Sequence, residues 1–172
     1  MLDVLTYFKA EIATVGRQWT DIISTLDAAT ACRHPIADMN HILWLTGHMA
    51  WAEDYLVVEI PTGKSHRRKA WDPIFDHSSE KLSDEAYPAW NEVRAEYIRV
   101  HAEVSRHLAF QNHSDLLRAS LLERQWFSTA SHSIAHQVTH GHYHLGQLVY
   151  IQKMLNPMNT IEPNRSSLEP QI

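Results

Sequence analysis

The sequence predicts an all-α protein, a four-helix bundle formed by a single domain over residues 1–172. Apolar residues recur at helical intervals along four long segments, no segment shows the alternation of apolar and polar residues typical of a strand, and prolines fall between the helical segments. The chain has 172 residues, of which 44% are hydrophobic, and this is enough to bury one sizeable core.

The first two helices are predicted from different patterns. Between Leu5 and Leu26, apolar side chains are spaced alternately by three and four residues, which is typical of a helix packed in a bundle. Residues 32–35 interrupt this pattern. The second helix is expected over Asn40–Val58, which contains no Pro and has a broad apolar face. Asp38 or Asn40 is expected to cap its N-terminus.

A long crossover is predicted over Ile60–Leu82. This segment contains Pro61, Gly63 and Pro73 and shows no helical period. An extended chain covers about 3.3 Å per residue, whereas a helix rises about 1.5 Å per residue. The connector is therefore long enough to run back along the bundle, so that the second and third helices can be parallel.

The third and fourth helices follow this connector. The third is expected from Tyr87 to Leu108 and opens near Ser83 or Pro88, because Pro is tolerated only in a first turn. A short helical turn is expected within residues 115–126. The fourth helix is expected after Ser128, up to Leu155, and the tail from about residue 157 is expected to be loosely ordered.

The composition excludes several classes of protein. The net charge of -5 argues against a dedicated binder of nucleic acid, because neutralising phosphates needs concentrated positive charge. No apolar run is long enough to cross a membrane, and Asp3, Lys9 and Glu11 argue against a signal peptide. Cys32 is the single cysteine, so no intrachain disulfide forms. We therefore expect a cytoplasmic protein with no nucleic-acid or membrane partner.

Thirteen histidines are the unusual feature of the composition. On the fourth helix, His140 and His144 are one turn apart and lie on or at the edge of the apolar stripe, whereas His142 lies on the opposite flank. Two ligands are too few for a metal, and His48 is the best candidate for a third because it lies in the most apolar part of the second helix. The spacing thus favours a three-histidine metal site.

Simpler interpretations of these histidines exist. A single His on an apolar face is more often a hydrogen-bonded core residue, and a pair spaced by four residues often lies on the surface. The sequence contains no HExxH motif, since Gln137 follows His136 and Gly141 follows His140, and this excludes the zinc-protease arrangement.

Two segments carry a resemblance to a known family. LTGHMAWAEDY at residues 45–55 and HGHYHLGQ at residues 140–147 resemble the motifs of the DinB/YfiT-like superfamily of metalloenzymes, and the similarity extends over nearly the whole chain. It implies a four-helix bundle in up-down-down-up order, with the long crossover between helices 2 and 3. It also implies His48, His140 and His144 as metal ligands.

The match to the family motifs is not complete. Leu145 and Thr139 stand where many members carry Arg and Asn, and neither is a ligand position. Three neutral imidazoles leave coordination positions open, which is typical of a catalytic metal. The ion is expected to be a divalent metal, with Zn, Ni and Fe(II) all compatible with three histidines.

Some other residues are candidates for supporting roles. Gln147 lies one turn after His144 and is a candidate to support a ligand, although it can also be a simple flanking residue. Tyr55 lies two turns after His48 and is a candidate donor to a substrate, with a core tyrosine as the alternative. Glu53 and Asp54 are weaker candidates for a catalytic base. Two further features are expected to be inert, namely the Cys32 thiol and a solvated basic run at residues 67–69.

The resemblance also bears on activity. Members of the superfamily include transferases and an isomerase that use low-molecular-weight thiols, which implies a metal-dependent S-transferase acting on a small electrophile. A metal-activated hydrolase is the nearest alternative, and a non-catalytic bundle held together by its metal is another. We also expect a homodimer, because the first helix carries Tyr7, Phe8 and Trp19, and the second helix is apolar on more than one face.

Overall fold

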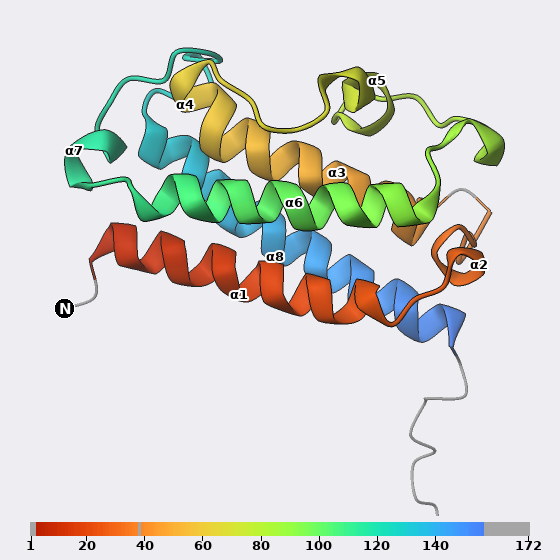
Figure 1. Ribbon diagram of the computed structural model, residues 1–172. Helices are drawn as coiled ribbons and strands as arrows, with labels where there is room; N and C mark the ends of the chain where they lie inside the picture. The colour runs from red at the N-terminus through yellow and green to blue at the C-terminus, as the bar shows by residue number, and fades with distance from the viewer. Residues whose placement is uncertain (1–2, 38, 157–172) are drawn as a thin grey trace, which may run out of the picture.

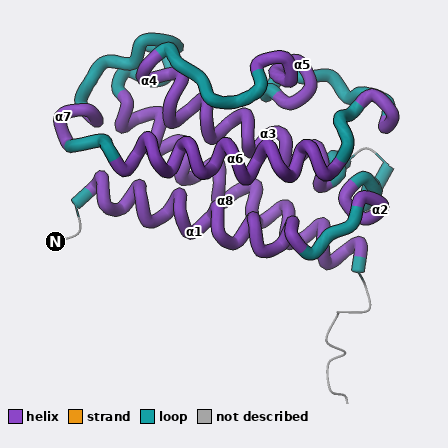
Figure 2. The backbone as a smooth tube through the Cα atoms, viewed as in Figure 1, coloured by secondary structure: helices purple, strands orange, loops and turns teal. Residues whose placement is uncertain are grey.

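The computed structural model describes residues 3–37 and 39–156, and in these ranges the regular structure is helical (Figure 2). Apart from one isolated bridge between Ala119 and Thr129, no β pairing occurs there. The long helices are α1 (Val4–Ser24), α3 (Ile42–Asp54), α6 (Trp90–Ala109) and α8 (Ala130–Leu155), which pack alongside one another (Figure 1). The all-α prediction is confirmed. The predicted loose tail lies outside the described residues.

The first helix follows its apolar pattern closely. The Asp3 carboxylate accepts a hydrogen bond from the Thr6 amide at 2.8 Å and caps α1. The predicted stripe is buried up to Trp19, after which Ile23 takes the buried position and the helix ends at Ser24. A four-residue helix, α2 (Ala28–Ala31), follows and is capped by Asp27. The sequence analysis did not predict α2.

The second helix differs from its prediction at both ends. His41 is the N-cap, since its Nδ1 accepts a hydrogen bond from the Trp44 amide at 2.9 Å, so the prediction of Asn40 is wrong. Asp38 lies outside the described residues. At the other end, α3 widens into a π-helical turn, η1 (Tyr55–Glu59), and continues as α4 (Ile60–Thr62). The helix ends at Gly63, where φ is +69°.

The connector between α4 and α6 is more ordered than its sequence suggests. It contains three short helical segments, η2 (Lys69–Trp71), α5 (Asp72–Phe75) and η3 (Asp84–Ala86). The Arg67 guanidinium is buried and pairs with carboxylates of Asp54, Glu59 and Asp72 at 2.6–2.9 Å. The expectation of a solvated basic run is therefore wrong for Arg67, which ties the connector to the end of α3 and to η1.

The later elements begin close to their predicted positions. Helix α6 starts at Trp90, just after Pro88, and not near Ser83. The short helix α7 (His113–Leu116) is closed by a capping box between Asn112 and Asp115, and it lies only partly within the predicted turn region. Helix α8 ends at Leu155, as predicted.

Helix α3 lies at the centre of the protein. Every residue of α3 except Trp44 is buried, and α3 contacts α6, α8 and α5. Its apolar surface is therefore covered within the chain, which removes one of the two grounds for expecting a homodimer. The homodimer itself stays a prediction. None of the described helices is both long and apolar enough to cross a membrane.

Candidate metal centre

Three histidines from two helices converge inside the protein. His48 is on α3, and His140 and His144 are one turn apart on α8. The Nε2 atom of His140 lies 3.2 Å from Nε2 of His48 and 3.1 Å from Nε2 of His144. His48 and His144 are buried, and His140 is half-buried. The structure thus brings together the three residues that the spacing and the resemblance favoured.

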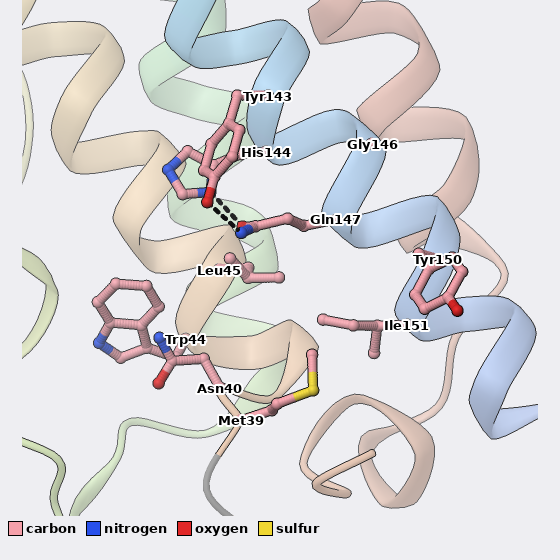
Figure 3. A pocket seen from close by; sticks show the side chains of 10 residues that line it. All are labelled: Met39, Asn40, Trp44, Leu45, Tyr143, His144, Gly146, Gln147, Tyr150 and Ile151. Atoms are coloured by element: carbon pink, nitrogen blue, oxygen red, sulfur yellow. Dashed lines mark hydrogen bonds between the residues drawn. The ribbon is translucent and has the colours of Figure 1, made fainter. Parts of the chain in front are cut away.

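Hydrogen bonds fix the orientation of two of these rings. His48 Nδ1 donates to the main-chain oxygen of Phe75 at 2.8 Å. His144 Nδ1 donates to Oε1 of Gln147 at 2.7 Å, and the Gln147 amide nitrogen donates to the Tyr143 hydroxyl at 2.9 Å (Figure 3). A neutral imidazole carries one proton. With that proton on Nδ1, the Nε2 atoms of His48 and His144 both present lone pairs to His140.

The cluster favours neutral histidines. Burial, with a smaller contribution from the neighbouring His144, lowers the pKa of His48 to about 4 against the opposing hydrogen bond to Phe75. Burial and the adjacent His144 and His48 lower the pKa of His140 to about 3. Burial also lowers the pKa of His144. Neutral imidazole is the form that binds a metal.

The spacing of the nitrogens suits one bound ion. Two imidazole nitrogens that bind zinc tetrahedrally at about 2.0–2.1 Å are about 3.3 Å apart. The observed separations of 3.1 and 3.2 Å are close to this value. Two lone pairs pointing at one ring are satisfied by a single proton only in part, because His140 Nε2 can donate to one neighbour at a time. A cation can accept the Nε2 lone pairs of all three histidines, so the residues fit a metal ion.

Two tryptophan rings pack near His48, and the connector packs closely on α3 beside it. The rings of Trp44 and Trp51 stack near it, with centroids 4.7 and 5.7 Å away. On the neighbouring Gly47, an added Cβ would lie 2.4 Å from the Phe75 ring. Glycine at this position therefore lets Phe75 of the connector pack directly on α3, where its main-chain oxygen reaches His48.

Two cavities adjoin the cluster. The larger, of about 730 Å³, has His144 and Gln147 in its wall and is otherwise lined by apolar, aromatic and uncharged polar residues (Figure 3). The smaller, of about 420 Å³, has His140 and Tyr55 in its wall. Small molecules thus have space to approach the histidines on two sides.

A model of the DinB superfamily matches residues 11–148. The chain belongs to the DinB superfamily. Its fold is similar to that of a conserved protein from Enterococcus faecalis, with a TM-score of 0.68 over 91% of this chain and 99% of the other, at 13% identity. Identity this low shows a shared fold alone. No curated protein matches the chain.

The two candidate supporting residues of this DinB protein differ in position. Gln147 holds His144 directly. Tyr55 forms no hydrogen bond with the three histidines. Its hydroxyl donates to Glu123 at 3.3 Å, and both residues line the smaller cavity. Burial, followed by the nearby Glu123 carboxylate, raises the pKa of Tyr55 to about 12, so this hydroxyl is a neutral donor.

The acids Glu53 and Asp54 are already paired, and two other histidines of α8 have separate surroundings. The Glu53 carboxylate lies 2.7 Å from His101 Nδ1, and Asp54 is bound by Arg67. His142 pairs with Glu11 at 2.8 Å, away from the cluster. His136 lines the smaller cavity. Neither Glu53 nor Asp54 is thus free to act as a base at the histidines.

Two features of the centre escaped the sequence analysis. The acceptor for His48 is a main-chain oxygen, which leaves no signature in residue identity, and the sequence analysis placed Phe75 in an irregular connector. Residue identity does not reveal Glu123 either, because its distinguishing feature is a backbone angle. It is the one non-glycine residue with positive φ, at +49°, in the described part of the chain. Phe75 reaches α3 only through the folded path of the connector between α4 and α6.

Proposed function

We propose that this protein is a metal-dependent S-transferase in which His48, His140 and His144 hold a divalent ion, Zn, Ni or Fe(II). In the proposed reaction, a thiol from solution loses its proton and forms a carbon–sulfur bond to a small electrophile, whose leaving group departs with the electron pair of the broken bond. The observation that carries the proposal is the convergence of three neutral imidazoles between two cavities. An ion held in this way lowers the pKa of a thiol or water bound to it and so supplies a nucleophile.

Groups of the chain itself orient and cover the proposed metal ligands. Phe75, through its main-chain oxygen, and Gln147 hold the rings of His48 and His144 with Nε2 free. Trp44 and Trp51 cover His48 and exclude water from it. These contacts fix the ligands before any small molecule binds.

A nucleophile from solution fits the state of the chain's own thiol. Cys32 lines neither cavity. Burial and the nearby Asp84 raise the pKa of its thiol, which keeps it protonated and unreactive. With Glu53 and Asp54 already paired, an external thiol activated by the ion is the simplest source of the attacking atom.

Cobalt substitution tests the proposal directly. Protein loaded with Co(II) is titrated with 2-mercaptoethanol and then with cellular thiols while its absorption spectrum is recorded. We expect a sulfur-to-cobalt charge-transfer band, which the His140→Ala variant lacks because it does not retain cobalt. A loaded protein that shows no band with any thiol contradicts thiol transfer, and an exchangeable water on its cobalt then favours the hydrolase. A site closed to water and thiol alike favours the non-catalytic bundle.

The order of the helices is also part of this proposal. We propose the up-down-down-up order of a four-helix bundle, supported by the course of the α4–α6 connector along the bundle in Figure 1. Distances between spin labels test it. A short distance from the end of α4 to the start of α6 contradicts the crossover.

A further inference from the structure

The smaller cavity, of about 420 Å³, has a chemistry of its own. Most of its wall is aromatic or histidine. Among the described residues, Glu123 provides the one carboxylate of this wall, and no Lys or Arg lines it. The aromatic residues of the wall are Trp51, Tyr55, Trp126 and Phe127.

One loop supplies Glu123 and two of these aromatic residues, Trp126 and Phe127, to the cavity wall. The main-chain oxygen of Glu123 accepts hydrogen bonds from the amides of Trp126 at 2.9 Å and Phe127 at 2.8 Å. Glu123 adopts the left-handed conformation, with φ of +49°, which a non-glycine residue rarely adopts. Residues with such strain cluster at functional sites. Glu123, Trp126 and Phe127 all line the same cavity.

A second wall of the cavity comes from α3 and η1. The rings of Trp51 and Tyr55 stack with centroids 4.7 Å apart, and the Tyr55 hydroxyl donates to the Glu123 carboxylate at 3.3 Å. The Arg67 guanidinium lies 5.7 and 5.6 Å from the centroids of these two rings. Its charge is balanced by the three carboxylates that bind it, so Arg67 adds little positive potential to the cavity.

We propose that this cavity binds a small organic cation, an amine or quaternary ammonium group, among its aromatic side chains with the Glu123 carboxylate as counter-ion. Aromatic faces attract cations through their quadrupole, and a nearby carboxylate adds a direct charge interaction. Because His140 shares the wall, the inference deepens the proposed function by giving the electrophilic substrate a cationic group. Only the assignment of the cation as substrate rests on the proposed function, because binding of a cation in this cavity does not require a metal.

A pair of probes of the same shape isolates the role of charge. Choline and its neutral analogue 3,3-dimethylbutan-1-ol are titrated by calorimetry into the protein as purified, at pH 8, where ordinary histidines are neutral. We expect choline to bind about tenfold more tightly than the alcohol. Equal affinities, or no binding of choline in the millimolar range, would overturn the proposal.

Two charge-removing variants locate the site. Glu123→Gln keeps the shape of the side chain, and we expect it to weaken choline binding about tenfold while leaving the alcohol unchanged. Glu85→Gln removes the same charge from an exposed position away from the cavity and is expected to bind choline normally. Choline affinity that is the same in all three proteins overturns the proposal.

Metal content separates this inference from the proposed function. Glu123 forms no hydrogen bond or ion pair with the three histidines, so the Glu123→Gln protein is expected to retain the metal content of the wild type. Lost choline binding with metal retained supports the cation site. A metal centre that is present beside a cavity indifferent to choline removes the cation site and leaves the proposed function standing.

Discussion

Two groups of potential metal ligands in this protein have similarly close ligand atoms, but their histidine nitrogens differ in hydrogen bonding. His48, His140 and His144 form one group, and His34, His41 and Asp84 form the other, with possible ligand atoms within 4.8 Å of one another in each. In the first group, Nδ1 of His48 and of His144 donates outward and Nε2 faces the centre. In the second, His41 Nδ1 accepts the Trp44 amide, so the proton of its neutral ring is on Nε2.

This difference shows that proximity alone does not make a metal site. A ring whose Nε2 carries the proton has no lone pair there to offer. His34 Nδ1 lies 2.6 Å from the Met39 main-chain oxygen, and its Nε2 lies 3.1 Å from the exposed carboxylate of Asp84. The second group therefore caps a helix and joins a loop, whereas the first group has nitrogens available for an ion.

The largest difference is expected in metal content. His140→Ala removes the central nitrogen of the first group, and we expect the purified protein to lose its bound metal. His142→Ala, a change on the same helix, is the matched control and is expected to retain it. Elemental analysis of protein purified without chelator measures the metal content of both variants. Loss of metal from the His142 variant alone would show that the ligand assignment is wrong.

A smaller effect is expected from the residue that orients His144. Gln147→Leu removes the acceptor for Nδ1 and is expected to weaken metal affinity about 10- to 100-fold. Gln152→Leu, on the same helix and outside both cavities, should leave affinity unchanged. Competition with a chromophoric chelator measures these affinities. Equal affinity in both variants would reduce Gln147 to a flanking residue.

The first group should also make stability depend on pH. The folded-state pKa values of His48 and His140, about 4 and about 3, lie below the ordinary value of about 6.5. As pH falls below about 6.5, the unfolded chain takes up protons that the folded chain does not, so the metal-free protein, prepared with a chelator, loses stability. His140→Ala removes one such proton and should flatten this slope by on the order of 1 kcal/mol per pH unit. Urea unfolding at a series of pH values measures the slope.

His101 provides a control of opposite sign. Burial lowers its pKa, but the hydrogen bond and charge of Glu53 outweigh burial and raise the pKa overall. Its contribution to stability is complete below about pH 6.5 and is lost as pH rises through the raised value. Glu53→Gln should therefore remove a decline in stability above about pH 6.5. An unchanged alkaline limb would show that the pair does not titrate.

The smallest effect is expected in the second group. His41→Asn retains a side chain that can cap α3, whereas His41→Ala does not, and we expect the alanine variant to be less stable by about 1 kcal/mol. Both variants should keep the metal content of the wild type. Thermal unfolding and elemental analysis together test this, and loss of metal from either variant would erase the distinction between the groups.

The sequence predicted best where one helix's own pattern decides the outcome. Phe8 and Val15 are buried as the spacing of α1 requires, and the one-turn separation of His140 and His144 was enough to place them together. His48 was found because an imidazole in an apolar helix needs a partner. These inferences need only helical geometry and the cost of burying a polar group.

The sequence predicted least where distant main-chain atoms meet. Pro61 suggested that the second helix ends before it, but the π-helical turn carries the helix on to Gly63. The sequence does not predict the burial of Arg67, because its three carboxylate partners lie at separate positions along the chain. The strain at Glu123 is likewise a property of the folded loop and not of residue identity.

If the proposed ion binds, the contact between Phe75 and His48 couples its binding to the docking of the connector. The connector packs through Phe75 on Gly47 and fixes His48 through a hydrogen bond, so an ion that favours this ring orientation also favours the docked connector. Linkage is reciprocal: docking of the connector raises the metal affinity by some factor, and metal binding raises the docking equilibrium constant by the same factor. The exchange of amide hydrogens in residues 64–76 should therefore slow on metal addition. The connector thus becomes a reporter of occupancy that can be read without a substrate.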